Sequence, residues 1–310
     1  MLIADAHCDT ILHLAMGKSL KHNPSGQLDL ERMEKGRIAL QFFAVFVEDQ
    51  YVYNGKSLKR SLSCIEAFYK ELNNNKHMLF QILEKKDLKR IGQGKLAALL
   101  TLEGGECLEG SLEILSFLYR IGVRSMGLTW NRRNNIADGI SEARTTGGLT
   151  NFGVNVVQEM NRLGMLIDAA HLSETGFWDV IDTTSRPIIV SHANCKNLYD
   201  HPRNLSDEQI NALAENGGVM GVTFVSDFLG LNADVETAVN HVDHVCQLLG
   251  TSKHIGFGSD FDGTDNLAKG LENAGHYYQL IESLSKRGYR KEDIERIAGK
   301  NILRILYDVF

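Results

Sequence analysis

The sequence predicts a (β/α)8 TIM-like barrel, in which eight parallel β-strands alternate with α-helices. Eight short runs recur along the chain and are apolar almost throughout, as expected for strands that are buried on both faces. Longer amphipathic stretches separate these runs, which is the pattern of repeated strand–helix units. The eight predicted strands lie near residues 2–6, 39–47, 97–102, 122–129, 165–170, 187–191, 218–225 and 254–259.

Five of the stretches between the strands carry apolar residues at helical spacing, with charged residues interleaved. Their ends carry local signals, because Ser206-Asp-Glu-Gln209 has the capping-box pattern and Gly164 and Gly250 stand where helices should stop. No segment has the composition of a linker, so we expect residues 1–310 to form a single barrel domain. The five predicted helices span residues 57–74, 152–163, 206–215, 235–249 and 273–286.

The composition is that of a globular protein and excludes several classes of function. Hydrophobic residues make up 43% of the chain and charged residues 23%, which is ordinary for a folded domain. The net charge of -6 includes no long basic run, so we expect no nucleic-acid partner. The sequence shows neither a secretory signal nor a run of ~18 apolar residues, so we expect a cytoplasmic protein without membrane attachment. The five cysteines are widely spaced without a Cys-x-x-Cys pair, so any metal should be held by histidine and carboxylate.

Five of the eight predicted strands end in histidine, aspartate or glutamate. In barrels of this class the functional groups stand at the C-terminal ends of the strands, so these residues should converge on one rim. A single such residue is usually structural, whereas five strand ends of this kind predict a shared site. The residues are His7 and Asp9 after the first strand, Glu103 after the third, His171 after the fifth, His192 after the sixth, and Asp260 with Asp262 after the eighth.

Imidazole and carboxylate groups are ligands of Zn²⁺, and the three histidines with the two carboxylates Asp9 and Glu103 exceed what one catalytic zinc uses. One arrangement that satisfies all of them places two Zn²⁺ ions, with the Glu103 carboxylate bridging the pair. His7 and Asp9 would hold one ion, and His171 and His192 the other. Such a pair would hold a hydroxide and polarise a carbonyl, which favours hydrolysis of an amide or a related bond. His241 and His244 also stand three apart, but they precede no strand end, so we interpret them as packing or helix-surface residues.

Six separated motifs follow one another along the chain: Asp5-Ala-His7-Cys-Asp9-Thr10, Leu102-Glu103-Gly104-Gly105, Ile167-Asp-Ala-Ala-His171-Leu-Ser173, Val190-Ser-His192-Ala-Asn194, His201-Pro-Arg203-Asn204 and Gly256-Phe-Gly-Ser-Asp260-Phe-Asp262-Gly263. Together and in this order, they resemble the motifs of the membrane (renal) dipeptidase family of zinc metallopeptidases, whose barrel is of the metal-dependent hydrolase type. The resemblance covers almost the whole chain and is weakest over residues 10–95. The first motif is His-x-Asp where related amidohydrolases usually have His-x-His, which favours the dipeptidase branch.

The resemblance implies the same two-zinc arrangement, bridged by Glu103. It further implies that Arg203 pairs with the C-terminal carboxylate of a dipeptide and that Asp260 carries protons beside the metals. Members of this family commonly accept a D-residue at the C-terminal position of the dipeptide. They are commonly homodimers, so the resemblance also implies a homodimer here.

Two positions depart from the animal enzymes of the family. Where those enzymes have a histidine near the scissile carbonyl, this chain has Trp130, followed by Asn131. Phe228 stands where they have a tyrosine near the substrate carboxylate. We expect these three residues to line the substrate site, with Asn131 or the metals alone taking the part of the missing histidine.

The resulting prediction is a zinc-dependent dipeptidase that attacks the amide bond with a metal-bridging hydroxide. One alternative is an amidohydrolase acting on cyclic amides, lactones or N-acyl amino acids. Another is a metal-bound protein that binds ligands without catalysis. This alternative is favoured by Trp130, which stands in place of a catalytic histidine.

Overall fold

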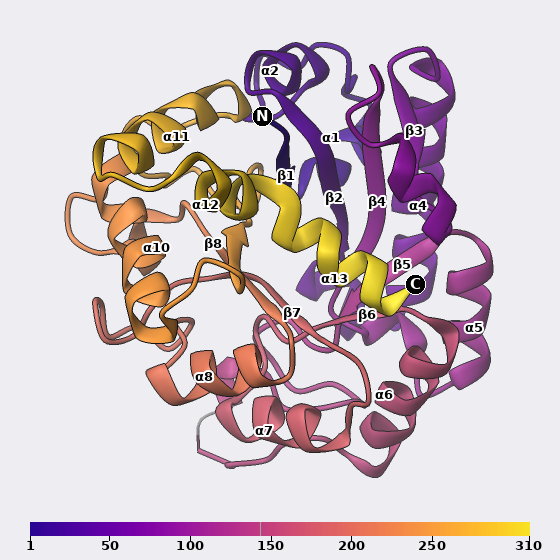
Figure 1. Ribbon diagram of the computed structural model, residues 1–310. Helices are drawn as coiled ribbons and strands as arrows, with labels where there is room; N and C mark the ends of the chain where they lie inside the picture. The colour runs from indigo at the N-terminus through magenta and orange to yellow at the C-terminus, as the bar shows by residue number, and fades with distance from the viewer. Residues whose placement is uncertain (143) are drawn as a thin grey trace.

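The computed structural model describes residues 1–142 and 144–310 and contains a closed barrel of eight parallel strands surrounded by helices (Figure 1). The barrel closes because its first strand pairs with its second and last strands. Each predicted run overlaps one of these strands, so the predicted (β/α)8 fold is confirmed. The strands are β1 (Ile3–Asp5), β2 (Ile38–Phe46), β4 (Leu96–Glu103), β5 (Val123–Gly127), β6 (Leu166–Asp168), β7 (Ile189–Ala193), β8 (Val219–Val222) and β9 (Ile255–Phe257).

A further short strand, β3 (Leu79–Gln81), lies beside the barrel and was not predicted. It pairs with residues 96–98 of β4, whereas β5 pairs with residues 100–103. Because β2 occupies the other edge of β4, β3 and β5 share one edge of that strand. Three residues are too few to show a strand period, which explains why sequence reasoning missed β3.

The helices form the outer layer of the molecule, as Figure 1 shows. Each predicted helix is present, and shorter ones lie between them. The α-helices are α1 (Thr10–Ala15), α2 (Leu30–Lys35), α3 (Asp49–Tyr53), α4 (Ser57–Asn74), α5 (Leu112–Arg120), α6 (Asn151–Leu163), α7 (Glu174–Thr183), α8 (Asp207–Glu215), α9 (Ser226–Leu229), α10 (Val235–Leu249), α11 (Tyr277–Lys286), α12 (Lys291–Glu295) and α13 (Asn301–Val309).

The helix ends follow the predicted local chemistry. The Ser206 hydroxyl accepts a hydrogen bond from the Gln209 N–H, and the Gln209 side chain accepts one from the Ser206 N–H, which completes the capping box. Gly164 and Gly250 end α6 and α10 in the left-handed conformation that glycine adopts without strain. The helix predicted from residue 273 starts with a 3-10 turn, capped by the Asn273 side chain, before α11 begins.

One end of the barrel is closed by α13, which crosses in front of the strands in Figure 1. Its apolar residues recur at helical spacing, so one face of the helix is buried. Ile302, Ile305 and Leu306 belong to the same buried cluster as Leu40, Leu99 and other side chains of the barrel strands. The other end of the barrel carries polar side chains, which form the centre described below.

Within the residues that the structure describes, none of the helices combines the length and the apolar character needed to cross a membrane.

Candidate metal centre

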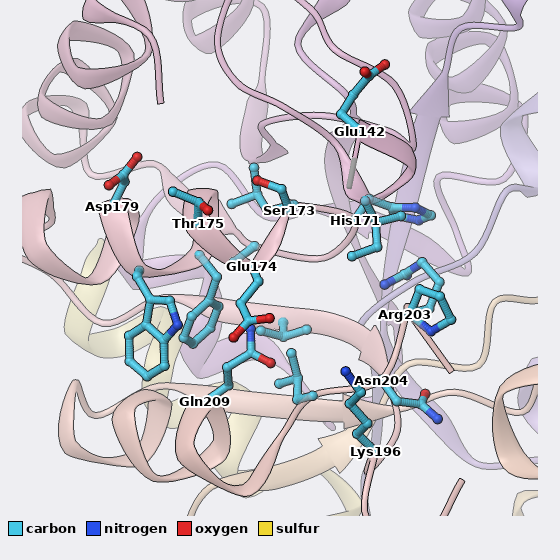
Figure 2. Close-up of a pocket in the computed structure, with 18 of the residues that line it drawn as sticks. Glu142, His171, Ser173, Glu174, Thr175, Asp179, Lys196, Arg203, Asn204 and Gln209 are labelled. Atoms are coloured by element: carbon cyan, nitrogen blue, oxygen red, sulfur yellow. The ribbon is translucent and has the colours of Figure 1, made fainter. Parts of the chain in front are cut away.

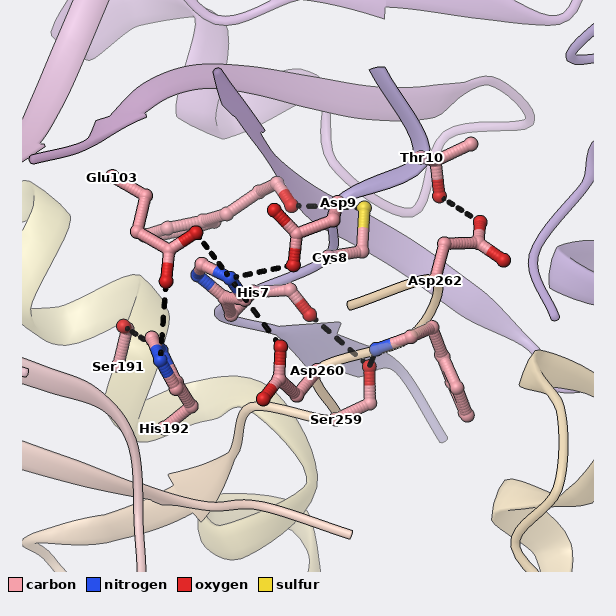
Figure 3. Close-up of polar contacts among 12 residues, drawn as sticks. His7, Cys8, Asp9, Thr10, Glu103, Ser191, His192, Ser259, Asp260 and Asp262 are labelled. Carbon is pink, nitrogen blue, oxygen red and sulfur yellow. Dashed lines mark hydrogen bonds and ion pairs between the residues drawn. The ribbon is translucent and has the colours of Figure 1, made fainter. Parts of the chain in front are cut away.

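The five predicted metal ligands converge where the barrel strands end, and all five side chains are buried. Figure 3 shows four of them, namely His7, Asp9, Glu103 and His192. Glu103, the last residue of β4, lies in the middle of the group. Its Oε2 atom is 3.7 Å from His7 Nε2. Its Oε1 atom is 2.9 Å from His171 Nε2 and 3.8 Å from His192 Nε2. The two oxygens of one carboxylate therefore face different histidines.

Two aspartates complete the side of the centre near His7. The His7 Nε2 atom is 3.3 Å from Asp9 Oδ2 and 3.7 Å from Asp260 Oδ1 (Figure 3). The other oxygen of Asp9, Oδ1, is buried and has no hydrogen-bond partner within the described part of the chain. A buried carboxylate oxygen without a partner is unfavourable, and a cation would satisfy it.

The ends of β1 and β9 are joined by Asp5. Its Oδ1 atom accepts hydrogen bonds from the N–H groups of His7 and Ser259, and its Oδ2 atom accepts one from the Ser259 hydroxyl, at 2.7 Å. The same hydroxyl also lies 3.1 Å from the His7 carbonyl oxygen. Asp5 thus sets where the backbone of His7 lies relative to the segment that carries Asp260.

Asp168 forms a second junction of the same kind between β6 and β7. Its Oδ1 atom accepts from the N–H groups of Ala170 and Ser191, at 3.0 and 2.9 Å, and its Oδ2 atom accepts from the Ser191 hydroxyl. The Ser191 oxygen lies 2.8 Å from His192 Nδ1. Sequence reasoning missed both junctions, although an aspartate stands two or three residues before a histidine in each motif, Asp5-Ala-His7 and Asp168-Ala-Ala-His171.

Burial and crowding of like charges govern the electrostatics of the centre. Burial lowers the pKa of His7, but the nearby carboxylates, Glu103 foremost, outweigh this effect and raise that pKa to about 10. Burial raises the pKa of Asp260 to about 6 and that of Glu103 well above its usual range. Crowded carboxylates are therefore costly to ionise in this place unless cationic charge is added.

The spacing of the donor atoms fits metal ions. The donor atoms of His7, Asp9 and Glu103 lie within 4.8 Å of one another, and so do those of Glu103, His171 and His192. A third set, in which His7 and His192 are joined by Asp260, meets the same limit. Glu103, His7 and His192 each belong to two of the three sets.

The predicted substrate residues lie around this centre. Arg203 is only 7% exposed, its Nη2 atom donates to the His192 carbonyl at 3.0 Å, and its Nε atom has no partner within the described residues. Its guanidinium carbon is 5.6 Å from the centre of the Phe228 ring. The Trp130 ring is 6.3 Å from the His171 ring, and the Asn131 Oδ1 atom is 2.7 Å from His171 Nδ1.

The other histidine pair is structural, as interpreted from the sequence. His241 is buried, accepts from the Cys195 N–H through Nδ1 and faces the Leu229 carbonyl with Nε2. His244 Nε2 is 2.7 Å from Asp207 Oδ1, which joins α10 to α8.

A profile of the membrane dipeptidase family, peptidase family M19, matches residues 1–309. The chain belongs to this family. An uncharacterized dipeptidase of Schizosaccharomyces pombe is 32% identical over an alignment of 326 positions, which covers 98% of this chain and 80% of that protein. The dipeptidase tcpJ of Claviceps purpurea is 32% identical over 297 residues, which span 92% of this chain and 70% of that protein. The protein is thus a metallo-dipeptidase, which sets aside the alternative of a binding protein without catalysis.

Solved structures share the fold of this M19 dipeptidase. A metallo peptidase from Rhodobacter sphaeroides, liganded with a phosphinate mimic of the dipeptide L-Ala-D-Ala, superposes with a TM-score of 0.92. It is 24% identical, and the match covers 100% of this chain and 99% of that one. An amidohydrolase from Pseudomonas aeruginosa matches with a TM-score of 0.82 at 25% identity, over 96% of this chain and 98% of that one.

A cavity of about 620 Å³ adjoins the metal centre of this dipeptidase (Figure 2). His171 and Arg203 form part of its wall, together with the first turns of α7, the segment that leads into α8, and Ile140, Glu142 and Thr146 from the loop after β5. Apolar side chains such as Phe177 and Leu205 line it together with polar ones such as Glu174 and Gln209. Its volume is within the range of roughly 300–1,000 Å³ that small-molecule sites occupy.

Proposed function

We propose that the protein is a zinc-dependent dipeptidase with two Zn²⁺ ions bridged by Glu103. The observation that carries this proposal is the position of the Glu103 carboxylate, whose two oxygens face separate histidines. His7 and Asp9 complete one site, and His171 and His192 complete the other. When bound, the two ions would supply Lewis-acid activation of water and of the scissile carbonyl.

Arg203 binds the C-terminal carboxylate of the dipeptide. Its guanidinium is buried beside the centre, and its Nε donor has no partner within the described residues. A substrate carboxylate would supply the hydrogen bond that this donor lacks there. The Phe228 ring forms one wall at this position and offers no hydrogen bond. Trp130 and Asn131 lie beside His171, where the scissile carbonyl would be placed.

Asp260 carries the proton. Its carboxylate borders the centre beside His7 and is partly accessible, with 15% of the side chain exposed. From this position it takes a proton from the attacking water and passes it to the leaving nitrogen. This transfer is needed because an amide anion is a poor leaving group.

The substrate class includes dipeptides with a D-residue at the C-terminal position, a proposal that rests on the family. The test is a panel of L,L-, L,D- and D,D-dipeptides, offered to protein with measured zinc content before and after chelation. We expect about two ions per chain, hydrolysis of free dipeptides, and loss of activity on chelation. One ion or none in active protein would refute the bridged site. Activity confined to substrates without a free amino terminus would favour the amidohydrolase alternative.

Three further predictions from the sequence stay proposals. We propose a cytoplasmic location, a homodimeric assembly and a single domain over residues 1–310. Cell fractionation, light scattering and limited proteolysis test them in turn.

A further inference from the structure

We propose that Asn131 is a positioning residue for the metal ligand His171. The inference rests on the proposed metal site and concerns the side of His171 that faces away from it. The His171 Nε2 atom points into the centre, 2.9 Å from Glu103 Oε1 and 2.7 Å from His192 Nε2. Because a neutral imidazole binds metal through its unprotonated nitrogen, the ring proton of His171 must then be on Nδ1.

Asn131 supplies the acceptor that this tautomer needs. Its Oδ1 atom is 2.7 Å from His171 Nδ1, which is at the short end of the range for N–H···O hydrogen bonds. The His171 ring is buried, with only 8% of the side chain exposed, so solvent is a poor substitute for this acceptor. With Nδ1–H donated to the amide oxygen, the Nε2 lone pair is left directed at the metal site.

The backbone of His171 is held by the same part of the chain. His171 has a φ of 67°, a left-handed conformation that is rare for a residue with a side chain. Its carbonyl oxygen accepts from the Ile140 N–H at 2.8 Å and from the Thr129 hydroxyl at 3.4 Å. The segment around Asn131 therefore fixes both the backbone and the ring of this ligand.

Asn131 is itself fixed by a close turn of the chain. Its carbonyl oxygen accepts from the Ser141 N–H at 2.8 Å. Gly139 packs against it so closely that an added Cβ atom would lie 2.6 Å from the Asn131 carbonyl oxygen and 2.3 Å from that of Trp130. Residues 130 and 131 are thus held by backbone contacts within the protein itself, as a positioning residue requires.

The two histidines of this half of the centre have different acceptors. His192 Nδ1 faces the Ser191 hydroxyl, which donates to the Asp168 carboxylate. The acceptor of His192 is therefore itself bonded to a negatively charged group. For its Nδ1–H group, His171 has the neutral amide of Asn131 as its acceptor within the described residues. Removing this amide should therefore weaken the metal site that holds both histidines and spare the one at His7 and Asp9.

The test compares Asn131→Ala and Asn131→Asp with the unaltered protein. Alanine removes the acceptor, and we expect the affinity of one of the two Zn²⁺ ions to fall about 10–100-fold. Aspartate keeps an acceptor oxygen at the same reach, so it should restore that affinity. The spectrum of bound Co²⁺ should change in the alanine variant and return in the aspartate variant.

Arg132→Ala is the matched control, because this neighbouring side chain is 58% exposed and pairs with Asp49 away from the centre. It should leave both zinc affinities unchanged. Unchanged zinc affinity in folded Asn131→Ala would overturn the inference, and so would an aspartate variant that fails to rescue it. The metal content of the unaltered protein tests the proposed function independently of Asn131. Fewer than two ions in that protein would refute the two-zinc site, whatever the Asn131 variants show.

Discussion

Replacing Asp168 by asparagine should remove one metal ion without unfolding the barrel. Asp168 Oδ1 accepts two backbone N–H groups, and Oδ2 accepts the Ser191 hydroxyl. Asparagine can keep the first two hydrogen bonds through its own oxygen. Its amide nitrogen, however, would then face Ser191 and can only donate.

The change at Ser191 reaches the metal site through His192. Once Asp168 no longer accepts its proton, the Ser191 hydroxyl turns to donate to His192 Nδ1, which lies 2.8 Å away. The proton of His192 would then move to Nε2, the atom that faces Glu103. A protonated Nε2 cannot bind metal, so we expect the affinity of one Zn²⁺ ion to fall about 10–100-fold. The lost charged hydrogen bond should also cost about 1.5–3 kcal/mol of the free energy of unfolding.

Asp5→Asn provides a matched control for this experiment. Asp5 accepts the same kinds of hydrogen bond, from two backbone N–H groups and the Ser259 hydroxyl. The Ser259 oxygen, however, lies 3.1 Å from a carbonyl oxygen of the backbone and not beside an imidazole nitrogen. We therefore expect a similar loss of stability with both zinc affinities preserved.

Chelator competition measures the two zinc affinities, and urea unfolding measures stability on the same samples. If zinc affinity falls equally in Asp168→Asn and Asp5→Asn, the effect comes from a loss of rigidity at the strand ends that both variants share. The account of the His192 tautomer would then be wrong.

Four other variants test the division of roles. Glu103→Ala should lower the occupancy of both ions, whereas His192→Ala should empty mainly one, and metal analysis showing equal losses would contradict the bridge. Arg203→Ala should lower kcat/KM by an amount equivalent to about 2–4 kcal/mol with the metals retained, and should abolish the preference for free dipeptides over their C-terminal amides. Asp260→Asn should retain both metals and lower kcat roughly 10²–10⁴-fold in single-turnover measurements, and loss of metal would make this residue chiefly a ligand.

The sequence by itself determined the fold and the rim on which the ligands gather. Buried strands are short apolar runs, and the outer helices have one apolar face. Both can therefore be recognised from the local pattern of apolar residues in the sequence. Parallel strands all end on the same side of a closed barrel. For this reason His7, Glu103 and His192, which are far apart in the chain, could be assigned to one site before any distance was known.

Only the tertiary structure decided how these side chains are oriented and supported. The register between neighbouring strands determines that Asp168 meets Ser191 and that Asp5 meets Ser259. The left-handed backbone of His171 and the turn at Gly139 bring Asn131 against the ring. The shape of the cavity beside α7 and α8 likewise depends on loops, and the sequences of these loops have no periodic pattern. Contacts of this kind join residues from separate strands and loops, and local sequence periods carry no information about which partner each will meet.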